Sequence, residues 1–163
     1  MIGSPEIVQM VETPTLGIRI QTPMRGMSRQ VDKLAVELFA WLKRQGITPG
    51  GPRYLRFYVI DMSGDMDIEF GVPVLIRQAG DGRVTAGVLP AGRYASLLYS
   101  GSGLAGNTAL IEWAMASHLR WDRWNDPKGD AFRSRFESYV TDPKVEPHKT
   151  TWLVKVASKL ADN

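Results

Sequence analysis

The first half of the chain carries one clear helical pattern of hydrophobic positions. Between residues 28 and 47, apolar side chains recur three and four residues apart, which places them on one face of an α-helix. The residues of this face are Val31, Leu34, Ala35, Leu38, Phe39 and Leu42. Gly46 follows the last of them and is a typical helix stop signal. The pattern therefore predicts a helix over "SRQVDKLAVELFAWLKRQGI".

Patterns typical of strands lie on both sides of this helix. Residues 6–23 form an extended run that is interrupted by Pro14. Residues 53–60 and 65–76 predict two further strands, joined by the turn "DMSGD". Alternation in the second of these assigns apolar residues to one face and acidic residues to the other. The apolar face holds Ile68, Phe70, Val72 and Val74, and the acidic face holds Asp67 and Glu69.

The second half repeats this order of elements. The predicted elements are strands over 83–90 and 92–101, a helix over 107–119, a loop over 121–131, and strands over 132–140 and 150–156. Asn107 is the candidate N-cap of the helix. One helical stripe holds Leu110, Ile111, Ala114 and Met115.

Both halves, about residues 5–77 and 82–156, therefore show the order strand, helix, strand, strand. No low-complexity linker separates them, so we predict one domain over residues 1–163. The expected fold class is α+β, with two pseudo-symmetric β-α-β-β modules. Their strands form a fused antiparallel sheet system, with two helices and a central ligand cleft.

A glutamate interrupts the strand pattern "FESYV". Alternation puts Glu137 and Tyr139 on one face and Phe136 on the other. Two interpretations are open: this face is solvated, or Glu137 and Tyr139 look into a cavity. If the halves are pseudo-symmetric, "IEFGVPV" and "FESYV" occupy related places, and Glu69 is the counterpart of Glu137. Glu69 is then either a second cleft carboxylate or the surface partner of a basic residue across the sheet.

Composition narrows the functional classes. The chain has 163 residues, 44% hydrophobic and 23% charged, as in ordinary soluble domains. No apolar run reaches about 18 residues, so we expect no membrane span. The start "MIGSPEIVQM" lacks the features of a signal peptide, and cytoplasmic localisation is expected. With no cysteine, disulfides and thiol nucleophiles are excluded.

Charge and motifs give little support to nucleic-acid, metal or cofactor chemistry. The formal charge of +3 is small, and Lys and Arg are scattered along the chain. His118 and His148 stand alone in their segments, so we expect no metal site and no cofactor. The segment "GSGLAGN" lacks the ending of a phosphate loop and favours a flexible lead into the second helix. Trp121 and Trp124 predict either a lid over the cleft or anchors of a long loop.

Several blocks of the sequence resemble a known family. They are "RYLRFYVI", "DIEFGVPV", "GVLPAGRYASLLYSGS", "FESYVTDP" and "HKTTWLVKV", in family order from about Pro5 to Val156. The chain resembles the GyrI-like (gyrase-inhibitor-like) small-molecule-binding domain. That domain also forms the effector-binding half of many bacterial transcription regulators that sense multiple drugs. The resemblance implies two strand-helix-strand-strand modules with a ligand cleft between them.

The resemblance also implies a binding site. Regulators of this kind hold lipophilic aromatic cations in a pocket lined by Tyr and Trp, with a glutamate at its floor. Glu137 matches that glutamate, and Tyr139 belongs to the same motif. We add Tyr58, Tyr99 and Trp113 as candidate walls, because a desolvated cation–π contact contributes about 2 kcal/mol. Glu69 is the remaining ligand-binding candidate.

Three functions follow as expectations. The first is a binding protein for hydrophobic, aromatic small molecules, with cationic ones favoured. The second is a cofactor-independent hydrolase of strained cyclopropane natural products, in which Glu137 and Tyr139 supply acid–base help. The third is a protein that modulates DNA gyrase through an outer surface. We find no helix-turn-helix pattern, and we therefore expect a stand-alone module without direct DNA binding.

Overall fold

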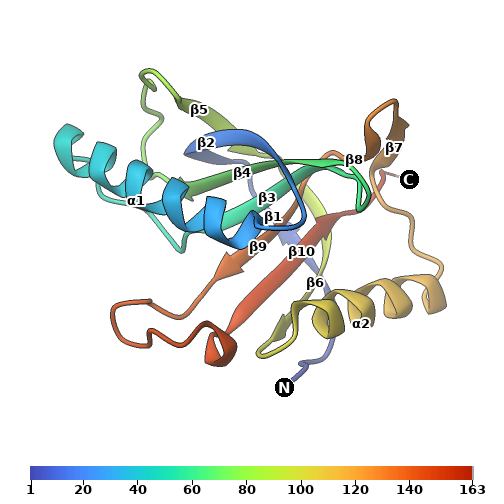
Figure 1. The fold of residues 1–163 in the computed structure, drawn as a ribbon. Coiled ribbons are helices and arrows are strands. Elements are labelled where there is room, and N and C mark those ends of the chain that lie inside the picture. The colour runs from blue at the N-terminus through green and yellow to red at the C-terminus, as the bar shows by residue number, and fades with distance from the viewer. Residues whose placement is uncertain (163) are drawn as a thin grey trace.

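The computed structural model describes residues 1–162 and shows two helices against a curled antiparallel sheet (Figure 1). The elements of the first half are β1 (Glu6–Met10), β2 (Thr13–Pro23), α1 (Met27–Gln45), β3 (Tyr54–Ile60) and β4 (Asp65–Pro73). Those of the second half are β5 (Val84–Leu89), β6 (Gly92–Tyr99), α2 (Gly103–Ala116), β7 (Arg123–Asp126), β8 (Gly129–Phe132), β9 (Arg135–Tyr139), the 3-10 helix η1 (Lys149–Thr151) and β10 (Val154–Lys159).

The order of the strands shows the internal symmetry of the sheet. It runs β1-β6-β10-β9-β3-β4-β2-β5, and β7 and β8 form a hairpin beside β3. The units β2-α1-β3-β4 and β6-α2-β9-β10 meet at the β3–β9 pair in the middle. This confirms the predicted α+β fold of two fused β-α-β-β modules.

The two outer strands are exchanged between the halves. β1 precedes the first unit but pairs with β6, and β5 precedes the second unit but pairs with β2. Only Val11 and Glu12 connect β1 to β2, and only Pro90 and Ala91 connect β5 to β6. Each connection spans at most about 11 Å, because a chain step covers no more than about 3.6 Å. The opposite ends of the sheet must therefore approach each other, which curls it into a half-barrel.

The two faces of the curled sheet are packed differently. Its inner face buries a cluster formed by Tyr54, Leu89, Tyr94, Phe136 and Ala157. Helix α1 covers β2 and β4 on the other face and buries Leu34, Leu38, Trp41 and Leu42. Gly46 ends α1 in the left-handed conformation, with φ 69°, as its position after the apolar stripe predicts.

Helix α2 differs from its predicted orientation. Leu110 and Ala114 are buried against β6 and β10, but Ile111 is 37% and Met115 is 70% exposed. Apolar residues occur all round this helix, so their spacing does not define a single buried stripe. The helix also begins four residues before Asn107. Ser102 is its N-cap, and the Ser102 hydroxyl accepts a hydrogen bond from the Ala105 amide at 3.1 Å.

Three expectations about strands were wrong. The run 6–23 is two strands at different places in the sheet, and 121–131 forms most of the β7–β8 hairpin. The segment "FESYV" lies in central β9, which corresponds to β3, whereas "IEFGVPV" lies in β4, which corresponds to β10. Glu69 is therefore not the counterpart of Glu137. Chain order alone does not say which of two consecutive strands occupies the centre of a sheet.

Neither helix of the described chain combines the length and hydrophobicity needed to cross a membrane.

Candidate functional site

Glu137 lies in a row of apolar side chains that crosses the helix-covered face of the sheet. Residues directly opposite each other on paired strands share a face. The row is Val84, Ile18, Phe70, Leu55, Glu137, Val156 and Leu97. Among these seven described residues Glu137 alone is polar, and the other six are no more than 4% exposed. A carboxylate in this row needs specific partners.

The position of Glu137 along the row places it between the two helices. α1 packs on β2 and β4, and α2 packs mainly on β6, while Glu137 belongs to β9 in the middle. Its strand neighbour Tyr139 packs against the apolar cluster beneath α2 and also against Leu55 and Ile68, near the start of α1. The central strands therefore form the floor between the helices, and Glu137 and Tyr139 lie on it.

Three neutral donors hold the Glu137 carboxylate. The Tyr99 hydroxyl and the Asn107 side-chain amide both donate to Oε1 at 3.1 Å, and the Tyr139 hydroxyl donates to Oε2 at 3.3 Å. Glu137 itself stays half-buried. Hydrogen bonds of this kind stabilise the charged form of a carboxylate and compensate its partial removal from water. We call Tyr99, Asn107, Arg135, Glu137 and Tyr139 the Glu137 site.

Both tyrosines of the site are fixed as donors. Burial, reinforced by the nearby Glu137 carboxylate, raises the pKa of Tyr99 and raises that of Tyr139 well above its usual value. Their hydroxyls therefore stay protonated at neutral pH. Negative charge at this site comes from Glu137.

Arg135 brings a positive charge to the same face of β9. Its Nη2 donates to the Asn107 side-chain oxygen at 2.9 Å, and its guanidinium lies 5.0 Å from the centre of the Phe132 ring. Burial lowers the pKa of Arg135, while Glu137 and Asp130 oppose this shift. Arg135 was not among the predicted site residues, and Asn107 was predicted to be a helix cap. Strand alternation puts Arg135 on the face of Glu137 and was the available signal.

Gly106 brings α2 close to the site. A Cβ added at Gly106 would lie 2.5 Å from ring atoms of Tyr99, so only glycine allows this approach. Asn107 follows it and reaches Glu137 across the interface. The glycine-rich segment that was expected to be a flexible lead is thus mostly the first turn of α2.

A long segment flanks the site beyond β9. Trp152 packs edge-on against Tyr139 with ring centres 5.9 Å apart, and its indole donates to the Glu146 carbonyl at 2.6 Å. Lys149 pairs with Asp32 of α1 at 2.5 Å. The segment between β9 and β10 therefore connects the floor of the site to α1. Trp113, a predicted wall residue, packs in the apolar cluster beneath α2 together with Tyr99.

The family follows from a direct comparison. A family model described as the GyrI-like small molecule binding domain matches residues 4–157. The chain belongs to this family. Its sequence has no significant match among curated proteins.

Solved structures show the same GyrI-like fold. The C-terminal domain of EcmrR aligns with a TM-score of 0.69 and 16% identity, covering 100% of both chains. EcmrR in its complex with DNA aligns with a TM-score of 0.72 and 17% identity, and the alignment covers 98% of this chain but 58% of EcmrR. The present chain thus spans little more than half the length of EcmrR.

Two further solved structures with this fold come from a protein bound to a small molecule and from a protein described as a hydrolase. SAV2435, bound to tetraphenylphosphonium, aligns with a TM-score of 0.60 and 10% identity over 97% of this chain and 94% of its own. A protein from Listeria innocua described as a hydrolase aligns with a TM-score of 0.63 and 13% identity over 96% and 91%. Identities this low show a shared fold.

Glu69 and Tyr58 lie on the opposite face of this GyrI-like sheet. Glu69 is 4% exposed, lies across from Arg19 and Arg56, and accepts a hydrogen bond from Tyr54 at 2.8 Å. The expectation that Glu69 and Tyr58 share a cleft with Glu137 is therefore wrong. The alternation of side chains along β4 explains the position of Glu69. Its neighbours Ile68 and Phe70 both face the helices, so Glu69 points to the opposite face.

Tyr58 has its own partners on that inner face. The guanidinium of Arg19 lies 3.7 Å from the centre of its ring, and that of Arg56 lies 4.3 Å away. Burial raises the pKa of Tyr58. Two arginine side chains therefore already lie against this ring.

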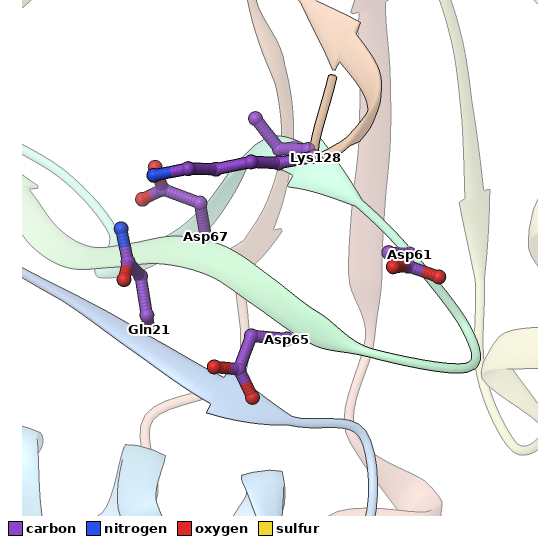
Figure 2. A pocket seen from close by; sticks show the side chains of 6 residues that line it. Gln21, Asp61, Asp65, Asp67 and Lys128 are labelled. Carbon is purple, nitrogen blue, oxygen red and sulfur yellow. The ribbon is translucent and has the colours of Figure 1, made fainter. Parts of the chain in front are cut away.

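An acidic hollow of about 240 Å³ lies on the same inner face, near the β3–β4 turn (Figure 2). It is lined by Gln21, Val59, Asp61, Asp65, Asp67 and Lys128. Asp67 is already bound by Arg19, which donates to both of its oxygens at 2.8 Å. The hollow is separate from the Glu137 site.

The two loop tryptophans of the GyrI-like domain also separate. Trp121 forms a bridge to Leu160 and packs beneath α2, which makes it an anchor. Trp124 lies on β7, is 42% exposed, and stacks on Arg133 at 4.8 Å.

Proposed function

We propose that this GyrI-like domain binds lipophilic aromatic cations at the Glu137 site, between α1 and α2. The observation that carries the proposal is the single carboxylate in an otherwise apolar row on the floor between the helices. Tyr139 and Trp152, which are both partly exposed, supply aromatic surface beside it, while the buried Tyr99 ring lies beneath α2 and contributes its hydroxyl. Tetraphenylphosphonium bound to the similarly folded SAV2435 has this chemistry and supports the same ligand class here.

The energetics favour a cation over a neutral compound of the same shape. Removing a carboxylate from water costs several kcal/mol, about as much as a well-placed opposite charge can offset. Three neutral donors lower this cost at Glu137 but leave its charge in place. Each aromatic face then adds about 2 kcal/mol when water is excluded from the contact. Such a site selects positive charge and aromatic surface more than a particular hydrogen-bonding pattern.

The experiment uses two ions of equal size and opposite charge, tetraphenylphosphonium and tetraphenylborate. Each is titrated into the protein while tryptophan fluorescence is recorded. We expect saturable binding of tetraphenylphosphonium and much weaker binding of tetraphenylborate. Glu137→Gln should weaken the cation about tenfold or more, which is about 1.4 kcal/mol.

A matched variant controls for the loss of a buried carboxylate. Glu69→Gln makes the same chemical change on the opposite face of the sheet and should leave tetraphenylphosphonium affinity unchanged. Equal affinity of wild type and Glu137→Gln for the cation would refute the role of Glu137.

A hydrolase is the second candidate. The Tyr139 hydroxyl touches Glu137, so the pair could supply a base for an attacking water and an acid for the leaving atom. The raised pKa of Tyr139 limits it to the acid role. The same fold in a protein described as a hydrolase supports this candidate. Mass spectrometry of a strained, electrophilic cyclopropane compound after incubation with the protein decides, because recovery of the unchanged compound excludes turnover.

A further inference from the structure

Arg135 and Glu137 are connected by a single side-chain amide. Asn107 accepts a hydrogen bond from Arg135 Nη2 at 2.9 Å on its oxygen and donates to Glu137 Oε1 at 3.1 Å through its nitrogen. The same nitrogen also donates to the Gly103 carbonyl at 2.8 Å, which fixes the amide on α2. The site therefore has a positive and a negative end, held in place by one residue of the helix.

The positive end lacks a direct counter-ion. None of the salt bridges within the described residues involves Arg135. A guanidinium has five N–H donors, and among residues 1–162 one acceptor, the Asn107 side-chain oxygen, is found for them. The side chain is half-buried and its ring contact with Phe132 holds it in place. Its remaining donors are thus suited to an anionic group that enters from outside.

The spacing of the two charged ends defines a ligand. Arg135 and Glu137 are two residues apart on one strand, so their Cα atoms are about 7 Å apart. A purely cationic ligand at Glu137 meets repulsion from Arg135. A carboxylate on the same ligand converts this repulsion into a bidentate hydrogen-bonded pair, the geometry that a guanidinium favours.

We propose that Arg135 makes the Glu137 site selective for aromatic zwitterions, which place a cationic centre at Glu137 and a carboxylate at Arg135, over purely cationic compounds of the same shape. The inference rests on the proposed function, because it concerns the same site. It adds a specificity-determining residue and a second charged group on the ligand.

Rhodamine 110 and rhodamine 123 test it as a matched pair. They share one cationic xanthene ring system, and the second is the methyl ester of the first, so they differ in a single carboxylate. Fluorescence anisotropy of each dye measures its affinity. We expect the wild-type protein to bind rhodamine 110 more tightly than rhodamine 123. Arg135→Gln should weaken rhodamine 110 about tenfold and should leave rhodamine 123 equal or tighter.

Two further variants separate charge from folding. Arg44→Gln removes an exposed arginine from the last turn of α1 and should change neither affinity. Arg135→Lys keeps the charge without the planar fork, and we expect it to retain part of the preference. The wild-type comparison stands even if Arg135→Gln does not fold.

The outcomes distinguish this inference from the proposed function. Equal or tighter binding of rhodamine 123 by the wild type overturns the role of Arg135, as does an Arg135→Gln variant with an unchanged preference. Failure of both dyes to bind overturns it as well. The tetraphenylphosphonium titration then shows separately whether the Glu137 site binds cations, even where the preference for zwitterions is absent.

Discussion

Two glutamates in similar strand sequences differ in their burial and in their hydrogen-bond partners. Glu137 stays half-exposed and is held by three neutral donors, whereas Glu69 is 4% exposed and takes one tyrosine hydroxyl. Glycine makes room for Glu69: a Cβ added at Gly17 would lie 2.9 Å from its carboxylate. Alternation predicted the pairing of Glu137 with Tyr139 on one face. It did not predict Asn107, because no pattern within a strand relates it to a helix residue 30 positions away.

Glu69 should make stability depend on pH. Burial raises its pKa, so the folded protein holds a proton there that the unfolded chain has already released. The stabilising effect of this proton is full below the unfolded pKa and is lost as pH rises through the folded pKa. We therefore expect Glu69→Gln, which is neutral at every pH, to gain thermal stability relative to wild type as pH rises from 4 to 8.

Melting temperatures of wild type and variant across this range check the prediction. Glu112→Gln, at an exposed position of α2, serves as the control and should run parallel to wild type. A constant difference between wild type and Glu69→Gln would contradict a buried, proton-binding Glu69.

The buried face of helix α2 could not be predicted from the sequence as well as that of helix α1. Apolar residues surround it, so spacing gave no unique buried face, and its glycines suggested flexibility. In the structure the reverse holds at Gly106, where the absent side chain lets the helix rest on the Tyr99 ring. Helix α1 was predicted almost to the residue, because its stripe is regular and Gly46 marks its end. The difference between the helices lies in how strongly each contrasts polar and apolar positions.

Gly106→Ala should lower both stability and binding. Alanine is favoured over glycine within a helix by about 1 kcal/mol, which alone would stabilise the protein. The new methyl group would instead overlap the Tyr99 ring and displace its hydroxyl from Glu137. We expect a lower melting temperature and weaker tetraphenylphosphonium binding.

Thr108→Ala provides the comparison for Gly106→Ala. It makes a helix-favouring change at an exposed position of the same helix and should be neutral or stabilising. A Gly106→Ala protein as stable as Thr108→Ala would show that the contact with Tyr99 is relaxed without cost.

The exchange of outer strands ties the two halves together at the scale of the molecule. β1 completes the sheet edge of the second half, and β5 completes that of the first. The sequence predicted the repeat and its order of elements, but strand order within a repeat carries no information on pairing between repeats. The curl likewise follows from the two-residue connections only once both pairings are known.

Fragments of the chain should show this dependence. We expect residues 1–79 and residues 80–163 to be unfolded as separate peptides, because each loses a strand partner and the β3–β9 contact. Mixing them should restore strand content in circular dichroism and tetraphenylphosphonium binding. A cooperative thermal transition in either fragment alone would show that the halves are independent units.

The placement of the helices has a consequence for the range of ligand sizes that the Glu137 site can accept. Each helix rests on the strands of its own half, and the floor between them is the seam where the halves join. The site is thus flanked by two helices that belong to different modules. A small change of twist at the β3–β9 seam would change the distance between the two helices without breaking the packing of either helix on its own strands. We expect this change in helix spacing to allow compounds of different thickness to bind, each with its cationic centre beside Glu137.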